Sequence, residues 1–328
     1  MIRLPAGFLP TLFKRVGHFL FVLWLAVTLL FCALVMVRGN PVTLFLDQRL
    51  TPELQENLKK IYGYDRSPLS QYVHYLGNLT RGQFGVSFSH KQPVRDVLSN
   101  RIGKSLWLGA FSYLLAIALS LLLLMGLQLA PSQKVKRLCE LIYTGLLTIP
   151  AFIFAALFIA FFGVKLKWFP VFGSRSLFQE ELHGLAALGN LVYHSIMPAF
   201  SVALPLAGRF TAYLNGQLNR LEKAPYIMSA RGRGLSERRV FFNHKMRSLM
   251  PVFIQLMGLY APMIAGGALV IEIMYGWSGM GIVMMEAVFS RDYPLLLGGC
   301  LWTAFFVIPG YELADFLRER LPGQEAMT

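Results

Sequence analysis

Long apolar runs alternate with shorter polar and basic segments along most of the chain. The apolar runs cover about residues 19–37, 106–129, 138–162, 191–214, 252–274 and 293–309. Each run is close to the roughly 20 residues that an α-helix needs to cross a bilayer. The pattern predicts an all-α polytopic membrane protein with six transmembrane helices. Because six is even, both termini should lie on the same side of the membrane.

Basic residues indicate the orientation of these helices. They gather in the second short loop (Lys134, Lys136 and Arg137), between Arg220 and Arg247, and after the last run (Arg318 and Arg320). Short loops rich in Lys and Arg stay in the cytoplasm. We therefore expect a cytoplasmic N-terminus (1–18), a first transmembrane helix (19–38), an extracytoplasmic segment (39–103), a core domain with the other five helices (104–317) and a cytoplasmic tail (318–328).

The first apolar run could be a secretory signal or an uncleaved helix. Its length exceeds the roughly 7 to 15 residues of a signal core, and no small-x-small cleavage site precedes Arg38. The uncleaved helix is the better interpretation.

Residues 39–103 are polar and rich in turn signals. Thr51–Pro52 and Ser67–Pro68 each read as an N-cap followed by proline at the first helical position. The second of these helices should bury a face, since apolar residues recur at helical spacing, at Leu69, Tyr72, Val73, Leu76 and Leu79. We expect a small extracytoplasmic helical subdomain. One interpretation is that this subdomain only packs on the membrane helices. The other is that it borders a path across the membrane and meets a substrate-delivery protein.

Composition excludes several classes of protein. Of the 328 residues 55% are hydrophobic and 15% charged, and the mean hydropathy is +0.52, too apolar for a soluble protein of this size. The net charge of +14 fits loops facing anionic lipid, and no basic run with stacking aromatics indicates nucleic acid. Cys32, Cys139 and Cys300 show no disulfide or metal-ligand spacing.

Motifs for chemistry are missing from the sequence. It contains no Gly-x-x-x-x-Gly-Lys-Ser/Thr loop for a nucleotide phosphate, no zinc spacing, no nucleophile elbow and no paired catalytic carboxylates. We expect no enzymatic activity, no metal and no cofactor in this chain.

The segment from Arg220 to Pro251 is the longest break in the apolar second half. A short helix after Pro225 would carry an apolar face of Tyr226, Ile227 and Ala230, and Gly232 and Gly234 would end it. Ser236 could cap a second helix whose Val240, Phe241 and His244 share a face. The segment is either a loop made basic by the positive-inside rule or a docking knob for a cytosolic partner.

Prolines and charges stand out inside the apolar runs. Pro150, Pro205 and Pro262 should kink their helices; the kinks could shape a central cavity or be tolerated packing features. Arg209 could snorkel to the cytoplasmic surface, line a cavity or pair with a carboxylate, and Glu272 lies near the outer end of the fifth run.

The basic segment also resembles a known family. Tyr226, Ser229-Ala230-Arg231, Gly234-Leu235-Ser236, His244, Arg247 and Pro251 are similar to the coupling loop of ABC-transporter permeases in the dipeptide, oligopeptide and nickel branch. In that family the loop inserts into a cleft on the ATP-hydrolysing subunit. The resemblance implies a coupling loop at 216–250, with contacts from Tyr226, Ser229, Ala230, Arg231, Gly232, Arg233, Gly234, Leu235 and Ser236. Arg231, Arg233, Arg238 and Arg239 could pair with acidic partner residues.

Two further stretches resemble the same family. Thr51-Pro52-Glu53, Gln71-Tyr72, Leu76-Gly77-Asn78-Leu79, Arg81-Gly82, Phe84-Gly85 and Pro93-Val94 look like its long first periplasmic loop. Glu272, Gly279-Met280-Gly281 and Arg291-Asp292-Tyr293-Pro294 look like its last extracytoplasmic loop. The resemblance implies a path or gate that includes Arg209, Glu272, Gly279, Gly281, Arg291 and Asp292.

The resemblance covers about residues 15–317 and implies the rest of the machine. We expect a type I ABC importer permease fold in a bacterial inner membrane. The partners would be a second homologous permease, two ATPase subunits that hold ATP and Mg, an extracytoplasmic substrate-binding protein and membrane lipid. Peptide is the expected substrate; nickel chelates, antimicrobial peptides and polyamines stay open, and import is favoured over export.

Departures from the family and alternative classes qualify this prediction. Pro225 stands where the family often has an acidic residue, Arg233 where it has Lys, and Ser278 where it has Pro, which puts partner fit and gating in question. An ion-gradient-driven transporter or channel usually carries buried ionisable residues near the midplane and repeated halves; here the spans are nearly free of acids and no internal repeat is evident. A membrane anchor would need no hinge loop.

Overall fold

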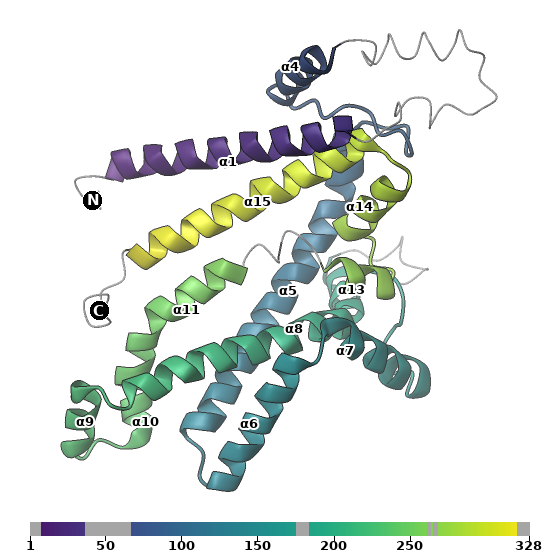
Figure 1. Cartoon of the computed structure of the whole chain (residues 1–328). Helices are drawn as coiled ribbons and strands as arrows, with labels where there is room; N and C mark the ends of the chain where they lie inside the picture. Colours follow the sequence, from purple (N-terminus) through teal and green to yellow (C-terminus); the bar gives the residue numbers. More distant parts are fainter. Residues whose placement is uncertain (1–7, 37–66, 175–183, 261–263, 265–267, 320–328) are drawn as a thin grey trace. The chain divides into compact units, whose positions relative to one another are not determined.

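The computed structural model describes residues 8–36, 67–174, 184–260, 264 and 268–319, which are mostly helical (Figure 1). The chain divides into two compact units, which we treat separately. One contains Met1–Gly103 and Ile282–Pro309, and the other contains Lys104–Gly281 and Gly310–Thr328. The predicted all-α class is confirmed, whereas the predicted domain boundaries stay predictions.

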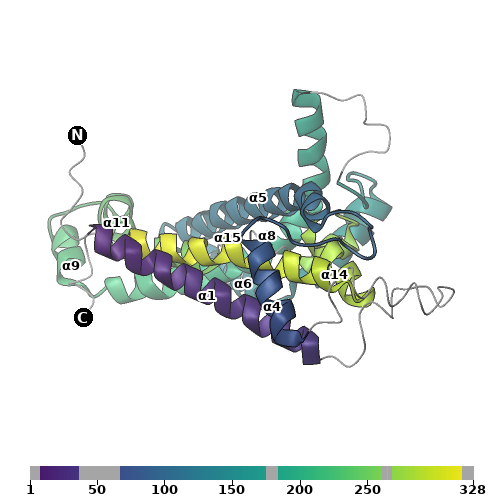
Figure 2. The same ribbon diagram turned by 90° about the horizontal axis from the view of Figure 1, so that it is seen from above.

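The first unit is built on two long apolar helices. α1 (Phe8–Met36) and α15 (Tyr293–Glu319) lie side by side in both views (Figures 1 and 2). The rings of Phe19 and Phe305 meet edge to face with centroids 6.0 Å apart. The unit also holds α4 (Pro68–Leu79), the start of α5 (Val94–Gln128) and most of α14 (Met280–Phe289).

Helix α4 begins as the sequence predicts but buries a different stripe. The Ser67 side chain accepts a hydrogen bond from the Ser70 amide at 3.4 Å, and Pro68 occupies the first turn. Tyr72, Tyr75, Leu76 and Leu79 are half-buried, and the Tyr72 ring packs at a tilt against Phe31 of α1, with ring centroids 5.3 Å apart. The prediction was wrong for Leu69 and Val73, which are 73% and 61% exposed. Burial follows the face that meets α1. Thr51–Pro52 lies outside the described residues.

The second unit packs around α8 (Leu185–Leu221). Before it come the rest of α5, α6 (Gln133–Thr148), α7 (Ala151–Phe158) and the π-helix η1 (Ile159–Lys165). After it come α9 (Pro225–Gly232), α10 (Glu237–Val240), the π-helix η2 (Phe241–Lys245), α11 (Met246–Tyr260) and α13 (Leu269–Met274).

Helix α8 carries groups of short helices at its two ends. α7 and α13 lie near its beginning, while α9 and α10 lie at its other end (Figure 1). Gly208 lets α6 come close to its middle, because a Cβ at this position would lie 2.6 Å from the backbone nitrogen of Leu147. Pro198 and Pro205 both lie inside this single helix.

Four helices of the described residues are long and apolar enough to cross a membrane: Lys14–Ala33, Val94–Gln128, Leu185–Leu221 and Tyr293–Glu312. The third predicted span is broken at Pro150, where α6 and the α7–η1 helix meet at 101°, and this pair could form a fifth span. Proline fits the break because it occupies the N-cap position of α7. The fifth predicted run, with Pro262, lies partly outside the described residues.

Candidate functional site

The segment between α8 and α11 folds into the helix, turn and second helix that the sequence predicts. Pro225 stands in the first turn of α9, where its missing N–H costs nothing. The second helix starts after Ser236 and continues through α10, η2 and α11 to Tyr260. Ser236 holds the N-cap position, but its side chain makes no capping hydrogen bond. We call α9 and the turn to Ser236 the knob.

Gly234 ends α9 in a Schellman motif. The Leu235 amide donates to the Ala230 carbonyl at 3.3 Å, and the Gly234 amide donates to the Arg231 carbonyl at 2.9 Å. Gly234 has φ +80°, in the left-handed region that glycine adopts without steric cost. Leu235 packs near Ala230, as is common in this motif. The chain therefore turns sharply after the knob helix.

A small apolar cluster holds the knob against the following helix. Ile227 and Val240 are fully buried, and Ala230 is 5% exposed. Ala224 and Leu235 pack around them. Of the predicted apolar face, Ile227 and Ala230 are buried. Tyr226 is 41% exposed, and its hydroxyl donates to the Ser248 hydroxyl at 2.9 Å.

The predicted docking residues divide into an outer and an inner group. Arg231 and Leu235 are half-buried and Ala230 is buried, whereas the others are exposed: Tyr226, Ser229, Gly232, Arg233, Gly234 and Ser236. Arg238 and Arg239 are exposed as well. The outer surface of the knob is consequently basic, with one aromatic ring.

Arg231 is engaged inside the chain. One terminal nitrogen of its guanidinium lies 2.7 Å from Glu222. Its Nε and its other terminal nitrogen donate to the two carboxylate oxygens of Glu237 at 2.6 and 2.9 Å. These hydrogen bonds lower the pKa of Glu237 and raise the pKa of Arg231. Of the four arginines predicted to meet acidic partner residues, Arg231 is thus already paired within the knob.

Lys245, which the sequence predictions did not include, links the knob to the membrane helices. Lys245 is 2% exposed, and its Nζ donates to Glu222 and, at 3.0 Å, to Gln128. Burial alone would raise the pKa of Glu222, but hydrogen bonds and charge from Lys245 and Arg231 bring it below its usual value. A signal was present: Lys245 falls four residues after Phe241 and four before Leu249, on the buried face.

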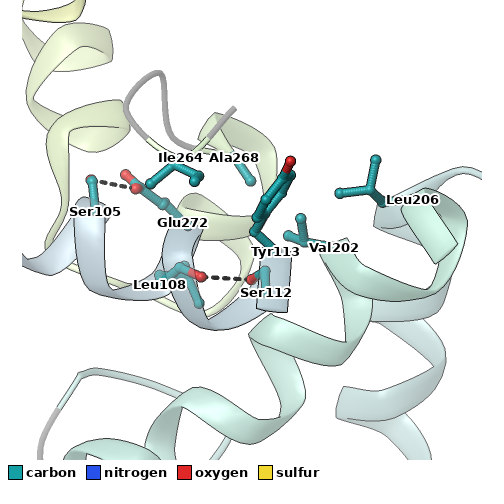
Figure 3. A pocket seen from close by; sticks show the side chains of 10 residues that line it. Ser105, Leu108, Ser112, Tyr113, Val202, Leu206, Ile264, Ala268 and Glu272 are labelled. Carbon is teal, nitrogen blue, oxygen red and sulfur yellow. Dashed lines mark hydrogen bonds between the residues drawn. The ribbon is translucent and has the colours of Figure 1, made fainter. Parts of the chain in front are cut away.

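A second cluster surrounds Glu272, which is fully buried. Its Oε1 accepts from the Ser105 hydroxyl and its Oε2 from the Gly281 amide, at 2.6 and 2.7 Å. The Met280 amide donates to the Ser105 oxygen at 2.7 Å. Glu272 and Ser105 face each other beside a small pocket, with Tyr113 on its wall (Figure 3). The carboxylate therefore ties α13 to α5 and to the first two residues of α14.

Two predicted glycines leave room for the carboxylate: Gly279, just before α14, and Gly281, its second residue. A Cβ at Gly279 would lie 2.5 Å from Glu272 Oε1, and one at Gly281 would lie 2.7 Å from Oε2. Any side chain there would collide with the oxygen atoms. Sequence reasoning found Glu272, Gly279 and Gly281, but missed Ser105, which lies 167 positions before Glu272 in the chain.

In the first unit, Asp292 is fully buried at the start of α15. Its Oδ1 accepts from the Leu295 amide at 3.2 Å, and its Oδ2 accepts from the Ser87 hydroxyl at 2.6 Å and from the Ser89 hydroxyl at 2.8 Å. Asp292 thus caps a helix and holds the 87–89 loop. Its neighbour Arg291 is exposed, with φ +51°.

Arg209 lies on an exposed face of α8. Tyr213 and Arg220 are exposed on the same face, at spacings of about one and three turns. Within the part of the chain that the structure describes, Arg209 forms no ion pair, so pairing with a carboxylate of this part is not observed. The structure leaves its snorkelling and its lining of a path as predictions.

Comparison with known proteins agrees with this architecture. The family described as "Binding-protein-dependent transport system inner membrane component" matches residues 116–322. The oligopeptide transport system permease protein AppB of Bacillus subtilis (strain 168) is 30% identical over 282 residues, covering 85% of this chain and 87% of the relative. The glutathione transport system permease protein GsiC of Escherichia coli (strain K12) is 26% identical over 296 residues, covering 90% and 88%.

These matches cover most of the chain and include the knob, both glycines beside Glu272 and Asp292. They confirm the predicted resemblance and set aside the gradient-driven transporter and the membrane anchor. A binding-protein-dependent system implies, in general terms, an ATPase and a binding protein as partners. The chain belongs to the family of binding-protein-dependent transport system inner membrane components, and it is a non-catalytic, multi-pass permease subunit of an ATP-binding-cassette transporter.

Proposed function

We propose that this chain docks one ATPase subunit through the outer surface of its knob and moves with it during transport. The observation that carries the proposal is the fixed geometry of α9: a proline start, a Schellman end at Gly234 and a buried Ile227. A short helix held this firmly can transmit a push to the membrane helices. Arg233, Arg238 and Arg239 are exposed beside it, and they suit an acidic rim on the partner.

The complete machine, in this proposal, contains this chain, a second homologous permease and two ATPase subunits that hold ATP and Mg. The chain forms six transmembrane helices with both termini in the cytoplasm, as in a type I importer, and the bent α6–α7 pair and the 252–274 run supply the spans beyond the four long helices. Residues 39–103 form the extracytoplasmic subdomain that meets the binding protein. A helix that proline breaks can still form a membrane span, because neighbouring helices satisfy the backbone groups that the break leaves without partners.

The substrate, in this proposal, is a short peptide taken up into the cell. AppB and GsiC carry the names of oligopeptide and glutathione systems, and both of those substrates are peptides with free carboxylates. Arg209 and Arg220 lie on one exposed face of α8, and a basic face suits a carboxylate in a water-filled path. In the second unit, the Glu272, Gly279 and Gly281 cluster would stabilise the outer end of that path. In the first unit, the exposed Arg291 and the buried Asp292 would serve the gate, with Asp292 holding the 87–89 loop.

Charge reversal on the knob tests the docking proposal. Arg233→Glu changes an exposed residue of the outer surface, and Lys134→Glu makes the same change on an exposed residue of α6. Each tagged variant is coexpressed with its genomic neighbours, extracted in mild detergent, and analysed by mass spectrometry of the bound chains. We expect Arg233→Glu to keep the second permease and lose most of one ATPase, and Lys134→Glu to keep both.

Two outcomes would contradict the docking proposal. One is a wild-type chain that purifies without any ATPase, and the other is equal ATPase retention in both variants.

Uptake of labelled tri-alanine, glutathione, nickel and spermidine by cells with and without the chain tests the substrate. Uptake of nickel or spermidine, without uptake of either peptide, would refute the peptide assignment.

A further inference from the structure

Lys245 occupies a position that an amphipathic pattern reserves for an apolar residue. It stands at the end of η2, where the Met246 amide donates to the Phe241 carbonyl in an i→i+5 bond. Phe241 and Leu249, one turn away on either side, are 2% and 1% exposed, and Lys245 is 2% exposed. Lysine is almost never fully buried unless its charge is paired. The buried ammonium group therefore needs partners inside the chain.

The partners of Lys245 come from different elements of the second unit. Glu222 is the residue that follows α8, and Gln128 is the last residue of α5. The Gln128 amide also donates to Asn215 of α8 at 3.2 Å. One ammonium group thus joins the ends of α5 and α8 to the helix that runs on into α11.

The same carboxylate continues the connection into the knob. Glu222 Oε1 accepts from Lys245, and its Oε2 pairs with Arg231 of α9 at 2.7 Å. Arg231 then holds Glu237, the first residue of α10. The polar chain runs from α5 through Lys245 and Glu222 to α9 of the knob and then to α10, beside the apolar contacts of Ile227.

We propose that Lys245 is a positioning residue that fixes the angle of the knob relative to the ends of α5 and α8. The inference rests on the proposed docking function. Ile227 and its small cluster keep the knob folded, and the Lys245–Glu222 pair determines where it points. Because Lys245 is buried while Glu222 is partly exposed, the pair is screened by salt less than a fully exposed ion pair. A knob without it would still form but would tilt or open more often.

Replacement by methionine tests the proposal with little risk to folding. Lys245→Met keeps the length of the side chain, and Glu222 retains Arg231 as its partner. The double variant Lys245→Met/Glu222→Gln leaves no charge at the buried position and gives a second route to the same question. Lys134→Met, on an exposed lysine of α6, is the matched control.

Two measurements are made on the detergent-extracted chain and on its complex with ATPase subunits. Hydrogen–deuterium exchange followed by mass spectrometry reports local opening of each helix. We expect amides of α9 to exchange at least tenfold faster in Lys245→Met and in the double variant, with α6 and α11 unchanged. Titration with purified ATPase subunit should show at least fivefold weaker binding. Lys134→Met should match the wild type in both assays.

The outcomes separate this inference from the docking function. Unchanged α9 exchange in both variants would overturn the inference, and so would faster exchange throughout α5, α6, α8 and α11, which indicates general packing. Faster α9 exchange with undiminished ATPase binding would overturn it too. If the wild-type chain binds no ATPase, the docking function fails, while α9 exchange still decides whether Lys245 anchors the knob.

Discussion

Gly234 offers the sharpest test of the knob, because its backbone conformation favours glycine while the space around it would admit a larger residue. Its φ of +80° would cost an L-residue with a Cβ about 1–2 kcal/mol. Yet, among the residues that the structure describes, a Cβ built at Gly234 meets no atom within 4 Å other than those of its two chain neighbours. Gly234→Ala should therefore act through backbone strain alone when the chain is by itself.

The expected size of the effect follows from that strain. About 1.4 kcal/mol corresponds to a tenfold change in an equilibrium constant, so the closed Schellman turn should become about 5 to 30 times less favoured. Gly232 is the matched control: it lies within α9, and its Cβ position is equally open. Gly232→Ala should leave the knob unchanged or stabilise it by up to about 1 kcal/mol, since alanine is the better helix former.

Comparison of alanine with asparagine at position 234 identifies the cause. Asparagine is larger but tolerates the left-handed region. We expect transport by Gly234→Asn to exceed transport by Gly234→Ala, measured as uptake of labelled peptide per assembled complex in vesicles, with insertion unchanged. If Asn is worse than Ala, the limit is space against the ATPase and the backbone explanation is refuted. Wild-type transport by Gly234→Ala would refute it as well.

Three further predictions concern the carboxylates. Gly279→Ala places a Cβ 2.4 Å from the Ser105 oxygen and should sharply reduce the amount of folded chain in membranes. Gly189→Ala, where the added Cβ has open space around it, should not reduce that amount. Equal amounts of the two variants in an immunoblot of membranes would contradict this prediction. Asp292→Asn places an NH2 donor where the Ser87 and Ser89 hydroxyls now donate to a carboxylate oxygen, so that donors face donors. The substitution should lower the free energy of unfolding by about 1–3 kcal/mol, seen as a lower melting temperature in detergent; an unchanged melting temperature would contradict the capping role. The pKa of Glu222 is lowered from 4.5 in the folded chain. The stability that ionised Glu222 contributes is therefore complete above pH 4.5 and is lost as the pH falls through the lower folded pKa. Hydrogen exchange of α9, corrected for its intrinsic pH dependence, should rise only on such acidification, and a rise between pH 6 and 8 would contradict this prediction.

The helical class and the shape of the knob could be predicted from sequence because both depend on local rules. Apolar runs of membrane length predict helices whatever surrounds them. Proline at the start and glycine after the end of α9 are signals read within a few residues. Gly234 was predicted as a helix stop, and the structure shows the backbone angle that explains it. The candidate residues Glu272 and Asp292 came from resemblance to the family.

The tertiary structure decided which polar groups meet. Glu272 bonds to Ser105, Asp292 to Ser87 and Lys245 to Gln128, over separations of 167, 205 and 117 positions. No local periodicity encodes such pairs, because each depends on how separate helices pack. The same reason explains why Arg231 is turned inward, and why α4 buries Tyr75 and exposes Val73. Sequence determined that these segments are helices and where the knob bends, whereas packing determined which side of each helix is buried and which charges are held there.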